Sequence, residues 1–268
     1  MNLKPQIGRP KSSGALKQAV ALDPATLDAR TIGLACGSGA IVTLTAIVLI
    51  PIGALTLFQA RRLYAALARL ACKAILRMYG VTVRVLQAEP FPKTQTIYIS
   101  NHTSTLDLFV LVALGLPNCR FFLSGFLKKI IPLGVISWMM GTFFTVPQDR
   151  PAERTRIFQR AERILRRTGE SVYLSPEGAR ITTGHIGHFN KGAFHLATNL
   201  HVPIVPFFIA IPPGMDPGRG IAAQAGVIDV QVMPAIDTRS WTLADLERNK
   251  ERVRDQFVSM HVEKRHAA

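Results

Sequence analysis

A run of thirty residues without a charged side chain restricts the fold of this chain most strongly. It extends from Thr31 to Ala60 and is bounded by Arg30 on one side and by Arg61 and Arg62 on the other. About 20 apolar residues suffice to cross the hydrocarbon core of a bilayer. The run therefore predicts a segment in or on a membrane, in preference to a helix buried in a soluble core.

Basic residues flank this run in equal number, five before it and five in the helix-length segment after it. The positive-inside rule therefore gives no orientation. A re-entrant hairpin with both ends in the cytoplasm suits this tie, and Pro51 and Gly53 are positioned to break a helix at its tip. A single span is the alternative, because residues 31–50 alone would reach about 30 Å as a helix. A secretory signal peptide fits poorly, since the run is too long and no A-x-A site follows it.

The run also divides the chain into three predicted parts. Residues 1–30 form a basic tail, and residues 31–80 form a membrane anchor followed by an interfacial helix, "ARRLYAALARLACKAILRMYG". Residues 81–268 form the remaining domain, in which short β-rich runs alternate with helical stretches. Strands are predicted at 81–86, 96–100, 120–124, 142–146, 171–175, 202–210 and 227–233, and helices at 104–115, 126–140, 151–168 and 190–200. This alternation predicts an α/β fold with a mostly buried central sheet.

The charge balance indicates a polyanionic partner. The chain has 32 Lys and Arg against 17 Asp and Glu, a net charge of +15. A phosphate-bearing substrate or an anionic membrane surface would satisfy it. Nucleic acid is not expected as a partner, because only 4 Tyr and 2 Trp are present and the charge is not gathered on one periodic face.

Cysteine and histidine usage does not indicate a metal site. Cys36, Cys72 and Cys119 lack C-x-x-C spacing and are expected to be reduced, apolar residues. His185 and His188 lie three apart in a Gly-rich loop, but no Cys and no nearby acid completes a ligand set with them. We therefore predict neither a metal nor a cofactor.

Two strand ends carry the residues with candidate chemistry. In open α/β sheets, ligands bind where loops leave the carboxyl ends of strands. The strand "TIYIS" leads to Asn101, His102 and Asp107. Histidine is the side-chain type whose unperturbed pKa lies near neutrality, and a carboxylate turned back on the ring of His102 would fix the tautomer and raise the basicity, as a general base for an alcohol requires. A purely local explanation, with Thr103 or Ser104 as the N-cap of the next helix, leaves Asn101 and His102 unexplained.

The second strand end is "SVYLS", which leads to "PEGAR" at 176–180. Glu177 and Arg180 flank Gly178 in a predicted tight turn, and an arginine at such a turn can hold a phosphate with two parallel hydrogen bonds. The alternative is an ordinary turn with a surface ion pair. Lys191, in "NKGAF", is suited either to a phosphate contact or to a solvated helix start.

Four blocks in order, "NHTSTLD", "GTFFTVPQDR", "SPEGAR" and "FNKGAFHLA" before "VPIVPFFI", closely resemble the glycerolipid acyltransferase family. The first block matches the family's N-H-x-x-x-x-D motif in full. The resemblance covers residues 96–210 and implies a mixed central sheet flanked by helices, with an N-terminal membrane-embedded segment. The chain departs from the family at Ser175 and Ala179, and Pro147 and Gln148 lengthen the second block before Arg150.

The resemblance implies transfer of a fatty acyl group from acyl-CoA or acyl carrier protein to the hydroxyl of a lysophospholipid, most simply 1-acyl-glycerol-3-phosphate. His102 would deprotonate that hydroxyl with support from Asp107. No covalent acyl-enzyme is required, in agreement with the absence of a G-x-S-x-G elbow from the sequence. The residues matching Arg150, Glu177, Gly178 and Arg180 would bind the glycerol phosphate of the acceptor, and Asn101 and Lys191 are further candidates for substrate binding.

The same family resemblance places the enzyme at the cytoplasmic (inner) membrane, with the catalytic domain on the cytosolic side where the soluble donor is found. The apolar run "FFLSGFLKKIIPLGVISWMMG" is either an acyl-chain groove with a basic rim at Lys128 and Lys129 or, as is more common, part of the core. Three other functions stay open: acylation of another lysolipid such as lyso-ornithine lipid, hydrolysis of the acyl donor, and lipid binding without turnover.

Overall fold

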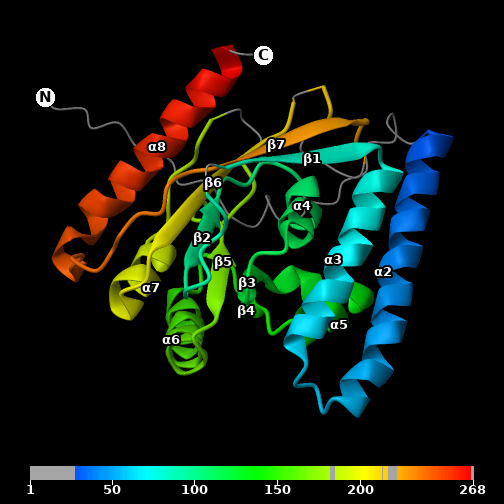
Figure 1. The fold of residues 1–268 in the computed structure, drawn as a ribbon, viewed down its shortest axis with the longest axis horizontal. Coiled ribbons are helices and arrows are strands. Elements are labelled where there is room, and N and C mark those ends of the chain that lie inside the picture. The colour runs from blue at the N-terminus through cyan, green and yellow to red at the C-terminus, as the bar shows by residue number, and fades with distance from the viewer. Residues whose placement is uncertain (1–27, 88, 182–184, 213, 217–221, 267–268) are drawn as a thin grey trace, which may run out of the picture.

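Seven strands form one mixed sheet at the centre of the protein (Figure 1). This computed structural model describes residues 28–87, 89–181, 185–212, 214–216 and 222–266, so the predicted tail at 1–30 lies almost wholly outside the described residues. The sheet order is β1-β7-β6-β2-β5-β3-β4, and of these neighbours only β6 and β7 run antiparallel. The strands are β1 (Val81–Leu86), β2 (Ile97–Ser100), β3 (Cys119–Ser124), β4 (Phe143–Thr145), β5 (Ser171–Leu174), β6 (Ile204–Ala210) and β7 (Gly226–Val232). All seven lie where the sequence predicts them, and the α/β fold with a mixed sheet is confirmed.

Helices cover both faces of this sheet (Figure 1). They are α2 (Ala29–Leu55), α3 (Arg61–Met78), α4 (Leu106–Leu114), α5 (Ile131–Met139), α6 (Pro151–Thr168), α7 (Gly192–Leu200) and α8 (Leu246–His266). The stretch predicted as one helix at 126–140 is divided into a 3-10 helix, Gly125–Lys129, and α5, which has Pro132 in its first turn. Proline lacks the N–H that a continuous helix would need at this point and suits a helix start. Helix α8 was not predicted.

Alternating side chains of the sheet pack into two separate cores. In β2, Ile97 and Ile99 join the core formed with α6, α7 and α8, whereas Tyr98 joins the core formed with α2, α3, α4 and α5. Successive residues of a strand point to opposite faces, so a strand buried on both sides must be apolar throughout. β2 is such a strand, and it lies between β5 and β6 at the centre of the sheet.

Helix α2 contains most of the uncharged run and is long and apolar enough to cross a membrane. It continues without a break through Pro51, so the expected interruption at Pro51 and Gly53 is wrong. The chain reverses instead at residues 56–60, where Leu57 and Phe58 adopt positive φ, and α3 returns against α2. Most of α2 is exposed, but its residue Leu49 is completely buried in the core.

Candidate active site

The loop after β2 begins with a buried amide. Asn101 is 1% exposed, and its side chain donates to the carbonyl oxygen of Ile209 at 2.9 Å and accepts from the Ile209 amide at 2.8 Å. These two bonds continue the pairing of β2 with β6 beyond Ser100, the last residue of the strand. The side chain of Asn101 therefore fixes the point at which the next residue, His102, leaves the sheet.

His102 and Asp107 form a hydrogen-bonded pair at this strand end. The distance from His102 Nδ1 to Asp107 Oδ2 is 2.8 Å. The carboxylate is almost fully buried, whereas a third of the imidazole is exposed. Because Nδ1 faces an acceptor, the neutral ring carries its proton there and keeps Nε2 as the basic nitrogen. A buried carboxylate beside an oriented, partly exposed imidazole is an arrangement that can act as a general base.

Asp107 also fixes the start of α4, in a different way from that predicted. Its Oδ2 accepts from the backbone amides of Thr103 at 2.8 Å and Ser104 at 3.0 Å, in addition to the imidazole. The N-cap is Thr105, not Thr103 or Ser104, and its side chain makes no capping bond. Three donors on one oxygen stabilise negative charge on it. The side chain that orients His102 is thus itself oriented by the backbone beside His102.

The "PEGAR" turn lies directly against this loop. Gly178 has φ +67°, a left-handed conformation that glycine adopts without strain, and it makes the predicted tight turn. Glu177 is buried at 4% exposure, and its carboxylate accepts from the amides of His102 at 2.7 Å and Gly187 at 2.8 Å. Burial raises the pKa of Glu177, and these backbone hydrogen bonds partly offset the increase. Glu177 therefore ties the two strand ends together instead of facing solvent.

Arg180 reaches the same place from the other end of the turn. Its Nη1 donates to Thr105 Oγ1 at 2.9 Å, and the amide of the following residue, Ile181, donates to the carbonyl oxygen of His102 at 2.8 Å. A guanidinium group is thereby held beside the His102–Asp107 pair. The structure brings together Asn101, His102, Asp107, Glu177, Gly178 and Arg180.

The two remaining predicted residues are engaged elsewhere. Arg150 is 63% exposed at the start of α6, with Glu153 at 3.5 Å. Lys191 is 56% exposed and makes an ion pair at 2.9 Å with Glu247 of α8. Neither of these ion pairs joins its side chain to the His102 loop. Their roles in acceptor binding stay predictions.

Two residues of this site were not predicted from the sequence. Thr105 was not singled out as the partner of Arg180, and Asp216 accepts a hydrogen bond from Ser104 Oγ across 112 positions of sequence. Asp216 lies in the loop that follows β6, which is rich in Pro and Gly. Such a loop has no periodic sequence pattern from which Asp216 could be predicted. Asp216 lies near the His102 loop because β2 and β6 are parallel neighbours whose carboxyl ends meet at the same end of the sheet.

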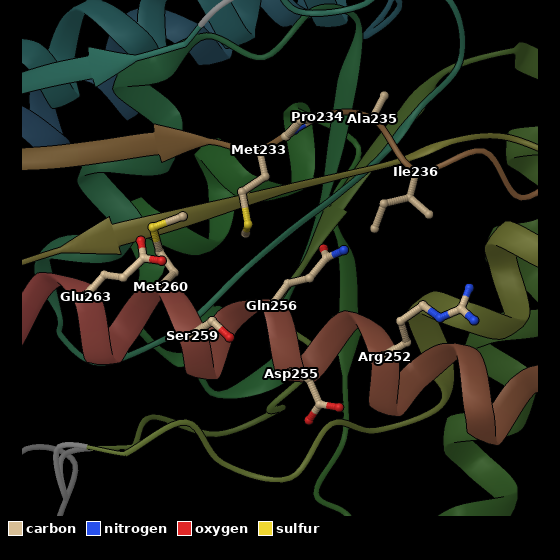
Figure 2. Close-up of a pocket in the computed structure, with 10 residues that line it drawn as sticks. All are labelled: Met233, Pro234, Ala235, Ile236, Arg252, Asp255, Gln256, Ser259, Met260 and Glu263. Atoms are coloured by element: carbon tan, nitrogen blue, oxygen red, sulfur yellow. The ribbon is translucent and has the colours of Figure 1, made fainter.

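The hollow drawn in Figure 2 lies apart from these residues. It is lined by residues 233–236 and by one side of α8, with Met233 and Met260 facing each other across it. The candidate active site instead lies at the carboxyl ends of the central strands β2 and β5, and its hydrogen bonds define it. Within the described residues, no group of three or more His, Cys, Asp or Glu is arranged to hold a metal ion.

Comparison with known proteins identifies a family match for much of this chain. Residues 82–210 match the model of the Acyltransferase family. The 1-acyl-sn-glycerol-3-phosphate acyltransferase of Saccharomyces cerevisiae is 30% identical over 68% of this chain and 60% of its own length. The alpha enzyme of that name from Homo sapiens is 28% identical over 72% of this chain and 68% of its own length. The chain thus spans about 60% of the yeast relative, and 51% of a chloroplastic relative from Brassica napus.

A solved structure shows the same fold. The crystal structure of the 1-acyl-sn-glycerophosphate acyltransferase PlsC from Thermotoga maritima superposes with a TM-score of 0.65 at 20% identity, over 86% of this chain and 97% of that one. The region that matches the family model, residues 82–210, begins in β1 and ends with β6, and so it includes both strand ends of the site. On this sequence match and this fold, residues 82–210 form a domain of the Acyltransferase family.

Proposed function

We propose that this chain transfers a fatty acyl group from a thioester donor to the free hydroxyl of 1-acyl-glycerol-3-phosphate, giving phosphatidic acid. The observation that carries the proposal is the His102–Asp107 pair at 2.8 Å, with its carboxylate buried and its imidazole accessible. The curated relatives named for this reaction support the choice of acceptor. The reaction needs a base for an alcohol and no nucleophile on the enzyme, and this pair supplies such a base.

In the proposed mechanism, His102 Nε2 removes the proton of the acceptor hydroxyl as its oxygen attacks the thioester carbonyl. Asp107 stabilises the imidazolium that forms, through the hydrogen bond to Nδ1. The tetrahedral intermediate then collapses, the carbon–sulfur bond breaks, and the imidazolium returns the proton to the departing thiolate. The base is regenerated within one turnover, without a covalent acyl-enzyme.

Arg180 is the residue that we assign to the acceptor phosphate, because its guanidinium lies beside the histidine loop through Thr105. An arginine can hold a phosphate by two parallel hydrogen bonds. Asn101, Glu177 and Gly178 act in this proposal by positioning the loop, since the two polar side chains are buried and bonded to backbone. Arg150 and Lys191 would contribute longer-range positive charge.

The donor is an acyl-CoA or an acyl carrier protein in this proposal, and both are anionic. The exposed face of α6 supports an anionic donor. Arginines spaced by four, three and four residues gather on this face: Arg156, Arg160, Arg163 and Arg167. Helix α6 begins next to the loop whose Gln148 lies against Gly178. This stripe would draw the donor toward the strand ends by charge complementarity.

We further propose that the enzyme works at the cytoplasmic membrane with its catalytic domain on the cytosolic side. Support comes from the exposed apolar residues of α2 and α5, among them Ile47, Ile131 and Trp138. A membrane location also suits the substrate. Removing a lysolipid chain from the bilayer costs about 0.8 kcal/mol per methylene, on the order of 10 kcal/mol in all.

Acyl transfer by membranes carrying this chain tests the proposal. Labelled palmitoyl-CoA is offered with 1-acyl-glycerol-3-phosphate or with a lyso-aminolipid, and native protein is compared with His102→Ala and Arg180→Met. We expect labelled phosphatidic acid, a loss of about 10² to 10⁴ in rate for His102→Ala, and a raised KM for the phosphate acceptor alone in Arg180→Met. Product formed only with the aminolipid would show that the acceptor is not 1-acyl-glycerol-3-phosphate. Release of free fatty acid without a new ester would indicate a hydrolase. Absence of any histidine-dependent product would favour a lipid-binding protein without turnover.

A further inference from the structure

Helix α8, which the sequence analysis did not predict, reaches the loop that follows the "PEGAR" turn. Arg254 is a half-buried residue of this helix, and it donates two hydrogen bonds to that loop. Its Nε lies 2.8 Å from the carbonyl oxygen of Gly187, and its Nη2 lies 3.1 Å from the carbonyl oxygen of Ile186. These bonds fix two successive carbonyl groups from a helix that lies outside the sheet.

The same stretch of backbone holds Glu177. The Gly187 amide donates to Glu177 Oε1 at 2.8 Å, while Glu177 Oε2 accepts from the His102 amide at 2.7 Å. Ile186 C=O and Gly187 N–H belong to one planar peptide unit, so fixing the direction of the carbonyl fixes the direction of the amide. Arg254 therefore bonds to the carbonyl group of this peptide and Glu177 bonds to its N–H. A continuous series of hydrogen bonds leads from α8 through this peptide and Glu177 to the backbone of His102.

Two further features favour this series over an incidental contact. A Cβ atom at position 187 would lie 3.3 Å from Glu177 Oε1 and 3.0 Å from the side chain of Ile181, so glycine allows the close approach of the carboxylate. In addition, a cation on the carbonyl of a peptide polarises its N–H, which strengthens the bond to the buried carboxylate. Glu177 is buried, and its acceptor oxygens are directed at these two amides.

We infer that Arg254 is a positioning residue for His102, acting through the Ile186–Gly187 peptide and Glu177. The inference rests on the proposed function only for its kinetic consequence. Its structural content, the restraint of the His102 amide by a side chain on the C-terminal helix, is independent of the reaction. Arg254 touches neither substrate nor reacting atoms in this scheme.

The test compares Arg254→Met, Arg254→Lys and a matched control, Arg252→Met, in the full chain. Arg252 lies on the same helix, is exposed and lines the hollow of Figure 2, so the control removes the same charge by the same substitution. Hydrogen–deuterium exchange is followed at residues 100–108. Circular dichroism and thermal unfolding show whether each variant is folded.

We expect the His102 amide to exchange about 10-fold faster in Arg254→Met and at the native rate in Arg252→Met. A lysine can restore one of the two carbonyl bonds, so Arg254→Lys should fall between them. In acyl transfer, Arg254→Met should lower kcat about 10-fold with KM within twofold of native, because misplacing a base affects the chemical step. It should have no added effect in a Glu177→Gln background, since contacts in one series are not additive.

Native exchange at His102 in a folded Arg254→Met protein would overturn the inference. So would equal reductions of kcat by Arg254→Met with and without Glu177→Gln. An Arg254→Met protein that unfolds, with Arg254→Lys native in both exchange and kcat, would show a role in folding only and would also overturn it. Absence of acyl transfer by the native chain would instead reject the proposed function, and the exchange measurement would still decide the role of Arg254.

Discussion

Replacing Asp107 by asparagine should remove a charge from the histidine pair while preserving its shape. All three hydrogen bonds that Asp107 accepts go to Oδ2, from His102 Nδ1, Thr103 and Ser104. The amide oxygen of asparagine can take this position and keep all three. The amide nitrogen then falls where Oδ1 lies, a buried position with no hydrogen-bond partner among the described residues. The variant therefore separates the effect of charge from that of geometry.

The expected loss of rate follows from the distance within the pair. With 2.8 Å between Nδ1 and Oδ2, the charge centres of an imidazolium and the carboxylate are about 4 Å apart. Two unit charges at that distance attract by about 4 kcal/mol at an effective dielectric constant of about 20. This attraction exists only while the ring is protonated, so its loss raises the barrier and lowers kcat by about 10³. The stranded NH₂ should reduce the free energy of unfolding by about 1–3 kcal/mol.

The assay is acyl transfer to 1-acyl-glycerol-3-phosphate, with kcat and KM determined separately and folding followed by thermal unfolding. Asp237→Asn is the matched control, because Asp237 pairs with Arg239 on the exposed surface. KM should stay near native in both variants, since Asp107 contacts no substrate in the proposed mechanism. A folded Asp107→Asn protein whose kcat stays within about 10-fold of native would refute the electrostatic role given to Asp107.

Three further outcomes are expected. Gly178→Ala should lower the free energy of unfolding by about 1–3 kcal/mol in chemical denaturation, because position 178 has φ +67° and a Cβ there meets a neighbouring side chain at 2.7 Å. Burial acts to raise the pKa of Glu170, but hydrogen bonds and charges from its arginine partners lower it overall. Its stabilising effect is therefore complete above the unfolded-state pKa near 4.5 and is lost as pH falls through the lower folded-state pKa. Below pH 4.5, native protein should thus lose stability more steeply than Glu170→Gln in pH-dependent unfolding. Replacing Arg156, Arg160 and Arg163 by glutamine should raise the donor KM several-fold at low salt and leave kcat unchanged, a difference that should vanish at high ionic strength.

The strands were predictable because each is a short β-rich run, either apolar throughout or alternating between apolar and polar residues. β2 and β5 are buried on both faces and read as short apolar runs. Because such runs alternate with helical stretches along the chain, they are assigned as strands of a central sheet. Helix α8 was missed for a physical reason. Its sequence, "LERNKERVRDQFVSMHVEKRH", is mostly polar or charged, and the few apolar side chains that it buries, such as Val253 and Phe257, form only a narrow stripe.

The candidate site was predictable to the extent that it follows a local motif. The spacing of His102 and Asp107 places both on one turn, and their contact needs no other segment. The roles of Asn101 and Glu177 were less accessible, since the sequence suggests substrate contacts and the structure shows bonds to backbone 108 and 75 positions away. Those partners depend on which strands are neighbours, which no single sequence pattern specifies.

The buried position of Leu49 matters for anyone preparing this protein. Cutting away α2 to obtain a detergent-free catalytic fragment would remove a side chain that is completely enclosed, together with Ala46 beside it. α2 also packs on α5, where a Cβ at Gly53 would collide with Met139. The shortened fragment would expose part of its own core to water and tend to aggregate. Solubilising substitutions on the exposed side of α2, for instance at Leu44 and Ile47, leave that core intact and are the better route to a tractable enzyme.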